Sequence, residues 1–123
     1  MPPDGWRATR RIIDQWGAGH AIITLNDRLA FGAYQALHEA GLSVPSDVSL
    51  VSFDDSPLAD WLRPGLTTFA IPHHDLGRRA VELLVELIAD DNVPTVARPA
   101  VHRVRLPLRV RGSVGRGEVA PLS

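Results

Sequence analysis

The chain has 123 residues, enough for one domain or part of one, and 45% of them are hydrophobic, enough to build a core. Its formal net charge of −1 gives no overall field that would draw it to nucleic acid or a membrane surface. The sequence contains no cysteine and no lysine, which excludes thiol catalysis, disulfides, thiolate metal sites, Schiff-base chemistry and a P-loop lysine.

The N-terminal third of the chain alternates between helix and strand signals. A first helix is expected from Asp4, its N-cap, to Trp16. Its inner face would carry Trp6, Thr9, Ile13 and Trp16, with the two tryptophans packed into the core. Residues 20–25 are too few and too rich in β-branched side chains for a helix, so they predict a buried strand. Asn26 then caps a second expected helix.

The rest of the chain predicts three more strands and one more helix. Residues 48–53 and 66–71 are expected to be strands, joined by an irregular loop that can contain one helical turn. Residues 75–89 carry an apolar stripe and predict a helix capped by its first residue. Alternation of arginine with apolar residues over 103–111 predicts a half-exposed edge strand, and a flexible tail is expected from about Gly112.

Strands that alternate with helices predict an α/β fold, in which a parallel sheet is flanked by helices on both faces and ends in a C-terminal edge strand. The elements are few, however, and a sheet of this size would leave its edges uncovered. The fold is therefore expected to be incomplete, as part of something larger.

Polar residues follow two of the apolar strands directly. Asn26 and Asp27 come after the first strand, and Asp54 and Asp55 come after the second. Ligands of open α/β sheets bind outside the carboxyl ends of parallel strands, so these residues predict a site for a small polar ligand. The alternatives are local ones: Asn26–Asp27 can serve as a helix cap, and Asp54–Asp55 can form a turn.

Three segments, in this order, carry a resemblance to a known family: AIITLNDRLAFGAYQALHEAGLSVPSDVSLVSFDDSPLADWLRPGLTTFAIP, LGRRAVELLVELI and LPLRVRGS. From about Gly5 to Ser113 the chain resembles the C-terminal part of the effector-binding region of LacI/GalR-type transcriptional regulators. The resemblance implies a periplasmic-binding-protein-like type I fold, with two α/β lobes facing a cleft. Residues 1–113 would then be a partial effector-binding domain, mainly the C-terminal lobe. A helix at about 72–92 would belong to the missing lobe, and 114–123 would be the tail.

The resemblance also implies roles for the residues at the strand ends. Asn26 and Asp54 would bind hydroxyl or amine groups of a sugar-like effector, and Asp27 and Asp55 would brace neighbouring backbone. His73 would lie near the mouth of the cleft.

A subunit contact is implied as well, since the helix after Asn26 and the loop after Asp55 match surfaces that pair subunits in this family. Trp61, in that loop, can stack on a ligand or serve the contact. The other residues assigned to a homodimer interface are Arg28, Phe31, Gln35, Leu58 and Leu62.

The most economical interpretation is an effector-binding module without catalysis and without a cofactor. The sequence contains no helix-turn-helix, so DNA contact is expected only through such a domain outside this chain. No signal-peptide core and no apolar run of about 20 residues is present, so a cytoplasmic protein without a membrane contact is expected. Adjacent His73 and His74 point to opposite sides of an extended segment, which argues against a metal site.

Two other functions remain open from the sequence. The first is a fragment of a sugar-binding protein of a transport system with the same architecture. The second is a carboxylate-based hydrolase that uses Asp54 and Asp55, although adjacent side chains at a strand end diverge and make a poor acid–base pair.

Overall fold

The computed structural model describes residues 3–90 and 101–116. They belong to two compact units, which are considered separately. The first unit contains residues 3–70 and 107–116, and the second contains residues 71–90 and 101–106.

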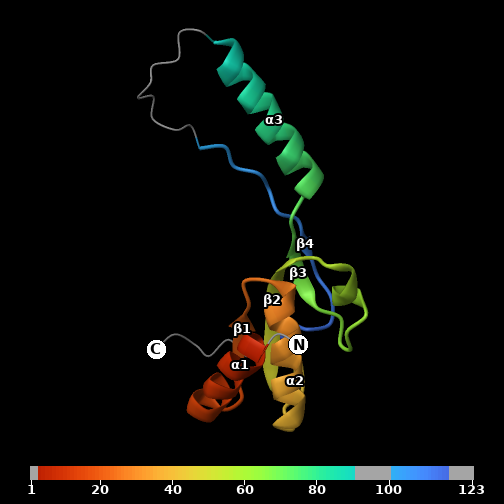
Figure 1. Cartoon of the computed structure of the whole chain (residues 1–123). Helices are drawn as coiled ribbons and strands as arrows, with labels where there is room; N and C mark the ends of the chain where they lie inside the picture. The colour runs from red at the N-terminus through yellow and green to blue at the C-terminus, as the bar shows by residue number, and fades with distance from the viewer. Residues whose placement is uncertain (1–2, 91–100, 117–123) are drawn as a thin grey trace, which may run out of the picture. The chain divides into compact units, whose positions relative to one another are not determined.

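The first unit is built on a four-stranded sheet of order β1-β2-β3-β4 (Figure 1). β1, β2 and β3 run parallel, whereas β4 pairs antiparallel with β3. The strands comprise His20–Ile23, Val48–Asp54, Thr67–Ala70 and Leu108–Arg109. The expected α/β fold with a mostly parallel sheet and an antiparallel edge strand is confirmed, although β4 is shorter than the predicted strand.

Two helices of the first unit pack against each other (Figure 1): α1, Pro3–Trp16, and α2, Asp27–Glu39. α2 also contacts β2 and contributes small, fully buried alanines to the core. Gly5 of α1 is buried at the start of α2, where a Cβ atom would collide with the backbone of Leu29. Small residues on both helices therefore permit their close approach. The core cluster consists of Ile22, Ala30, Ala33, Leu37, Val48, Leu50, Ala59 and Leu66.

The predicted burial of the two tryptophans of α1 is wrong, although Thr9 and Ile13 of the same predicted face do pack inward. Trp6 and Trp16 are 36% and 68% exposed, and the buried residues of the helix are Gly5 and Thr9. The Trp6 indole donates a hydrogen bond to the Glu39 carboxylate at 2.8 Å, so it lies along the rim of the α1–α2 contact. The expected N-cap, Asp4, lies instead in the first turn of the helix.

β1 is buried on one face only, contrary to expectation. Ile22 is 7% exposed and packs in the core, whereas Ile23 and Leu25 are 69% and 78% exposed. Side chains alternate between the two faces of a strand, and no described element covers the face that carries Ile23.

The segment expected to begin a tail at Gly112 is packed into the first unit. Ser113 is fully buried, and its hydroxyl donates to the Leu50 carbonyl at 2.6 Å and accepts from the Thr67 amide at 2.8 Å. Its own carbonyl accepts a hydrogen bond from the Leu50 amide at 2.8 Å. Residues 112–116 therefore tie β2 to β3; the rest of the predicted tail, 117–123, lies outside the described residues.

The second unit contains α3, His73–Ala89, which begins two residues earlier than predicted. Asp75 is consequently not its N-cap but lies in its first turn, after Pro72 at the cap position. The predicted apolar stripe is present, yet none of its side chains is buried among the described residues. Arg78 forms an ion pair with Glu82 at 2.9 Å on the polar side of the helix. None of the helices in the described residues is long and apolar enough to span a membrane.

Candidate functional site

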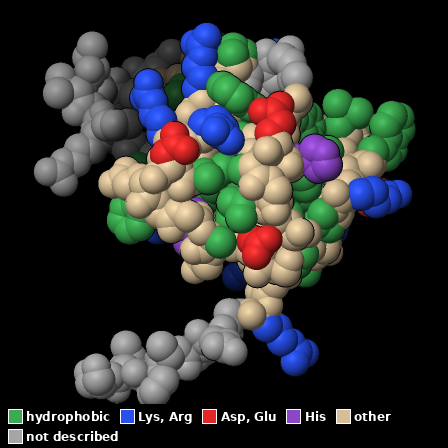
Figure 2. Space-filling model, turned by 90° about the horizontal axis from the view of Figure 1, so that it is seen from below, with side chains coloured by type: hydrophobic (Ala, Val, Ile, Leu, Met, Phe, Trp, Pro, Cys, Tyr) green, Lys and Arg blue, Asp and Glu red, His purple; other side chains and the backbone are tan. Residues whose placement is uncertain are grey.

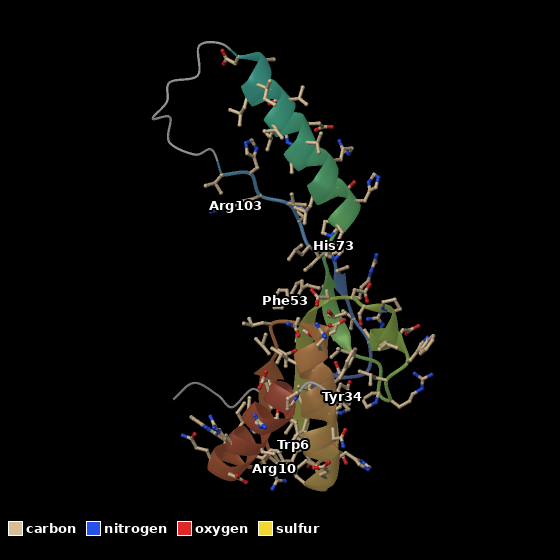
Figure 3. The ribbon with its side chains drawn as sticks, in the orientation of Figure 1. Trp6, Arg10, Tyr34, Phe53, His73 and Arg103 are labelled. Atoms are coloured by element: carbon tan, nitrogen blue, oxygen red, sulfur yellow. The ribbon has the colours of Figure 1, made fainter. Side chains whose placement is uncertain are left out.

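The carboxyl ends of β1 and β2 carry the candidate residues. These strands are adjacent and parallel, so Asn26–Asp27 and Asp54–Asp55 follow neighbouring strands at the same edge of the sheet. Phe53, labelled in Figure 3, marks this edge at the end of β2, where its ring stacks on Phe69 of β3 with centroids 5.1 Å apart. The fold thus brings the two polar pairs to one edge.

Asn26 is the N-cap of α2. Its side-chain oxygen accepts a hydrogen bond from the Leu29 amide at 2.9 Å, and its extended backbone is typical of this position. The side-chain N–H groups of Asn26 have no acceptor among the described residues. The cap uses only the oxygen of the Asn26 side-chain amide, so its two N–H donors are left for a ligand.

Asp27 is 1% exposed and faces inward. One of its carboxylate oxygens accepts from the Ser56 amide at 2.7 Å, and the other accepts from the Thr68 hydroxyl at 3.0 Å. A single buried side chain thus joins the end of β1 to the segment after β2 and to β3. Because both of its oxygens accept hydrogen bonds from the protein, the Asp27 carboxylate stabilises the backbone around the candidate site.

Asp54 and Asp55 have unusual backbone conformations. Their φ angles are +118° and +56°, in a region that favours glycine. Residues of this kind cost about 1–3 kcal/mol each and persist where their surroundings hold them in place. The Asp54 side chain is partly exposed and has no hydrogen-bond or ion-pair partner among the described residues. Its carboxylate is therefore available to a ligand.

Asp55 forms an ion pair with Arg111, a residue that the sequence analysis did not predict to lie at the site. Nη2 of Arg111 lies 2.8 Å from Asp55 Oδ1, and Nε of the more exposed Arg109 lies 3.7 Å from Oδ2. The backbone amide of Asp55 donates to the Thr68 hydroxyl at 3.3 Å. The arginines of 103–111 were expected on the exposed face of the edge strand, but the Arg111 side chain is only 20% exposed. Alternation of arginines with apolar residues gave no signal for this role.

The periplasmic binding protein-like domain family matches residues 2–114 of the chain. The chain belongs to this family. It is 35% identical to the ribose operon repressor of Escherichia coli K12 over 104 residues, 85% of this chain and 29% of the repressor. It is 50% identical to the lactose operon repressor of Rhizobium radiobacter over 66 residues, 54% of this chain and 58% of that protein. The chain thus spans less than two thirds of the length of either curated relative.

Solved structures of LacI-family regulators have the same fold. One from Sanguibacter keddieii is 38% identical, with a TM-score of 0.77 over 93% of this chain and 41% of that one. One from Enterococcus faecium with bound ribose is 30% identical, with a TM-score of 0.71 over 99% of this chain and 41% of that one. In sequence and fold the chain therefore matches part of LacI-family transcriptional regulators, the family that the sequence resemblance implied.

The LacI-family resemblance also predicts effector contacts for His73 and Trp61. His73 is the first residue of α3, in the second unit, and its side chain is exposed. Trp61 directly follows the short 3-10 helix η1, Pro57–Asp60, and is 73% exposed. A contact of either residue with an effector stays a prediction.

The five residues assigned to a LacI-type subunit contact lie on α2 and around η1. Arg28, Gln35 and Leu58 are exposed, although Gln35 donates to the Glu39 carboxylate at 3.0 Å. Phe31 and Leu62 are partly buried and also pack against the core. An open groove of about 590 Å³ runs along this surface, lined by Pro3, Asp4, Asn26, Arg28, Leu29, Phe31 and Leu58.

Tyr34 of α2 is partly buried next to the loop that precedes β3. Burial raises its pKa to about 12, and its hydroxyl donates to the Pro64 carbonyl at 2.8 Å. This tyrosine therefore fixes α2 to the loop before β3 and remains protonated at neutral pH (Figure 3).

The face of the molecule in Figure 2 shows acidic and basic side chains interspersed, without a patch of one sign.

Proposed function

We propose that the chain forms one wall of the effector site of a LacI-type regulator and binds a sugar or a related polyol through Asn26 and Asp54. The observation that carries this proposal is the unpaired carboxylate of Asp54. It sits on a backbone of positive φ, at the carboxyl end of β2 and next to the strand that leads to Asn26.

The chemistry of the two side chains suits a hydroxylated ligand. A carboxylate accepts charge-assisted hydrogen bonds from hydroxyl groups and holds them in a fixed direction. The free N–H groups of Asn26 can donate to a hydroxyl or ring oxygen. Solved neighbours with bound ribose and with bound lactose support this ligand class.

The effector site is expected to act within a longer protein. A helix-turn-helix domain would contact DNA, and effector bound between two lobes would change operator affinity through their closure. The surface on α2 and η1 would pair two subunits, and the protein would work in the cytoplasm.

Relatives that are named as repressors support a binding module rather than a transport component or a hydrolase. Asp55, already paired with Arg111, also suits neither acid nor base chemistry.

Asp54→Asn is expected to weaken sugar binding at least about ten-fold, because it removes the charge that strengthens hydrogen bonds worth roughly 1.5–3 kcal/mol. Isothermal titration calorimetry of the chain with ribose, and separately with lactose, measures this loss. The matched control is Asp14→Asn, an exposed carboxylate on α1 without a partner among the described residues. Asp54→Asn that binds either sugar as tightly as the wild type would rule out this role for Asp54.

Leu58→Glu is expected to turn a dimer of the chain into a monomer. An unpaired charge buried in an interface costs about 3–5 kcal/mol, and Leu58 is 48% exposed beside the groove on α2. Sedimentation velocity across a range of concentrations measures the change. Val114→Glu, at a similarly exposed position, should leave the dimer intact. A wild-type chain that is monomeric at every concentration would contradict the proposed subunit contact.

A further inference from the structure

Arg111 connects three parts of the first unit. Nη2 lies 2.8 Å from Asp55 Oδ1, Nη1 donates to the Leu66 carbonyl at 2.8 Å, and Nε lies 3.4 Å from the Asp60 carboxylate. Its backbone amide also donates to the Thr67 hydroxyl at 2.9 Å. One side chain thus joins the end of β2, the 3-10 helix η1 and the start of β3.

The absence of a side chain at Gly65 leaves room for the Arg111 side chain. A Cβ atom on Gly65 would lie 3.1 Å from Cδ of Arg111, closer than ordinary van der Waals contact. The aliphatic stem of the arginine therefore lies directly on the backbone of the loop before β3. This close fit, together with the three acceptors of the guanidinium, fixes the position of the charged group.

The backbone at the end of β2 needs such a support. Asp54 and Asp55 both have positive φ angles, and neither is a glycine. The contacts of Asp55 are its amide hydrogen bond to Thr68 and its ion pairs with Arg111 and Arg109. Arg111 makes the shorter of these ion pairs and is the less exposed of the two arginines, at 20% against 57%.

We infer that Arg111 is a positioning residue of the effector site: by holding Asp55 and η1, it keeps Asp54 at positive φ with its carboxylate free for the ligand. The part of this inference that concerns affinity rests on the proposed function. The part that concerns the conformation of Asp54 does not, and it can be measured without a ligand.

The first test is the backbone conformation of residues 54 and 55 in Arg111→Gln. The three-bond coupling between the amide and α protons depends on φ, so NMR measures it at both residues in the 123-residue chain. Arg111→Gln is expected to move both couplings toward the values of extended backbone. Arg109→Gln, which removes the longer and more exposed ion pair, should leave them as in the wild type. Unchanged couplings in Arg111→Gln would overturn the inference.

The second test separates positioning from general stability. Ser113→Ala removes a buried hydroxyl from the same C-terminal segment but does not touch Asp55. It is expected to lower the unfolding midpoint yet keep the couplings of Asp54 and Asp55. If it shifts these couplings as strongly as Arg111→Gln does, loss of stability alone explains both variants and the inference fails.

The third test uses ribose as the probe in calorimetry. Arg111→Gln is expected to bind ribose at least about ten-fold more weakly than the wild type, because a displaced carboxylate loses charge-assisted hydrogen bonds. Ser113→Ala and Arg109→Gln should retain the wild-type affinity.

Two outcomes separate the effector proposal from the positioning role. If the wild-type chain does not bind ribose, but Arg111→Gln still changes the couplings of residues 54 and 55, the effector proposal fails for ribose and the positioning role of Arg111 stands. Wild-type affinity in Arg111→Gln, with shifted couplings, would refute a role in binding.

Discussion

Asp27→Ala is expected to lower the free energy of unfolding by about 3 kcal/mol, because it leaves buried donors without their acceptor. The carboxylate is 1% exposed and accepts from the Ser56 amide and the Thr68 hydroxyl. Alanine would leave the Ser56 amide and the hydroxyl proton of Thr68 without their acceptor, and it would also remove a negative charge from the first turn of α2. Urea unfolding followed by circular dichroism measures the loss.

Asp27→Asn is the matched control for this prediction. The amide has the same size, its oxygen can accept from the Ser56 amide, and its N–H group can donate to the Thr68 hydroxyl oxygen. The expected cost is no more than about 1 kcal/mol, since a neutral hydrogen bond replaces a charged one. Equal loss in both variants would show that the charge of Asp27, and not its two hydrogen bonds, stabilises the fold.

Ser113→Ala is expected to lower the free energy of unfolding by about 2 kcal/mol, because it leaves a buried amide and a buried carbonyl unpaired. The amide is that of Thr67 in β3, and the carbonyl is that of Leu50 in β2. The methyl group of alanine fits the site but cannot replace either hydrogen bond. Chemical denaturation of the purified variant gives the value.

Ser46→Ala provides the comparison for this second variant. Ser46 is exposed in the connector before β2 and makes no hydrogen bond with a described residue, so its loss should change stability by less than about 0.5 kcal/mol. If Ser113→Ala changes the free energy of unfolding as little as Ser46→Ala does, the segment after Gly112 behaves as the tail that its sequence suggests.

Local patterns in the sequence were sufficient for the order of elements and for most of their ends. The β-branched run before Asn26 and the apolar run before Asp54 correctly predicted β1 and β2, and Asn26 caps α2 as expected. These features depend on neighbours within a few residues. The α/β class follows from their alternation, without knowledge of any contact across the chain.

Burial was harder to predict, because it depends on which elements are present to cover a face. Trp6 and Trp16 share the predicted inner face with Thr9, but of these three only Thr9 is buried, and α1 packs through it and Gly5. Small residues allow two helix backbones to approach, and a hydropathy pattern gives them little weight. Ile23 is apolar yet exposed, for the same reason: no described element lies over it.

The residues of the candidate site were found from their place after the strands, whereas the groups that hold them were not. No local signal marks Arg111 as the partner of Asp55, since the two are 56 positions apart in the chain. Positive φ angles at Asp54 and Asp55 were also unforeseen, because sequence suggests them mainly for glycine. The ligand contacts of Asn26 and Asp54 remain predictions.

The hydrogen bonds that frame the site also set the order in which it can be assembled. They join residues separated by 41 positions at Asp27 and Thr68, 56 at Asp55 and Arg111, and 63 at Leu50 and Ser113. Contacts between distant residues form late, since loop closure must come first. During synthesis, Asn26 and Asp54 leave the ribosome well before Arg111 does. A nascent chain therefore carries Asn26 and Asp54 before it carries the residues that hold their surroundings, and the candidate site is complete only when the segment after β4 has emerged.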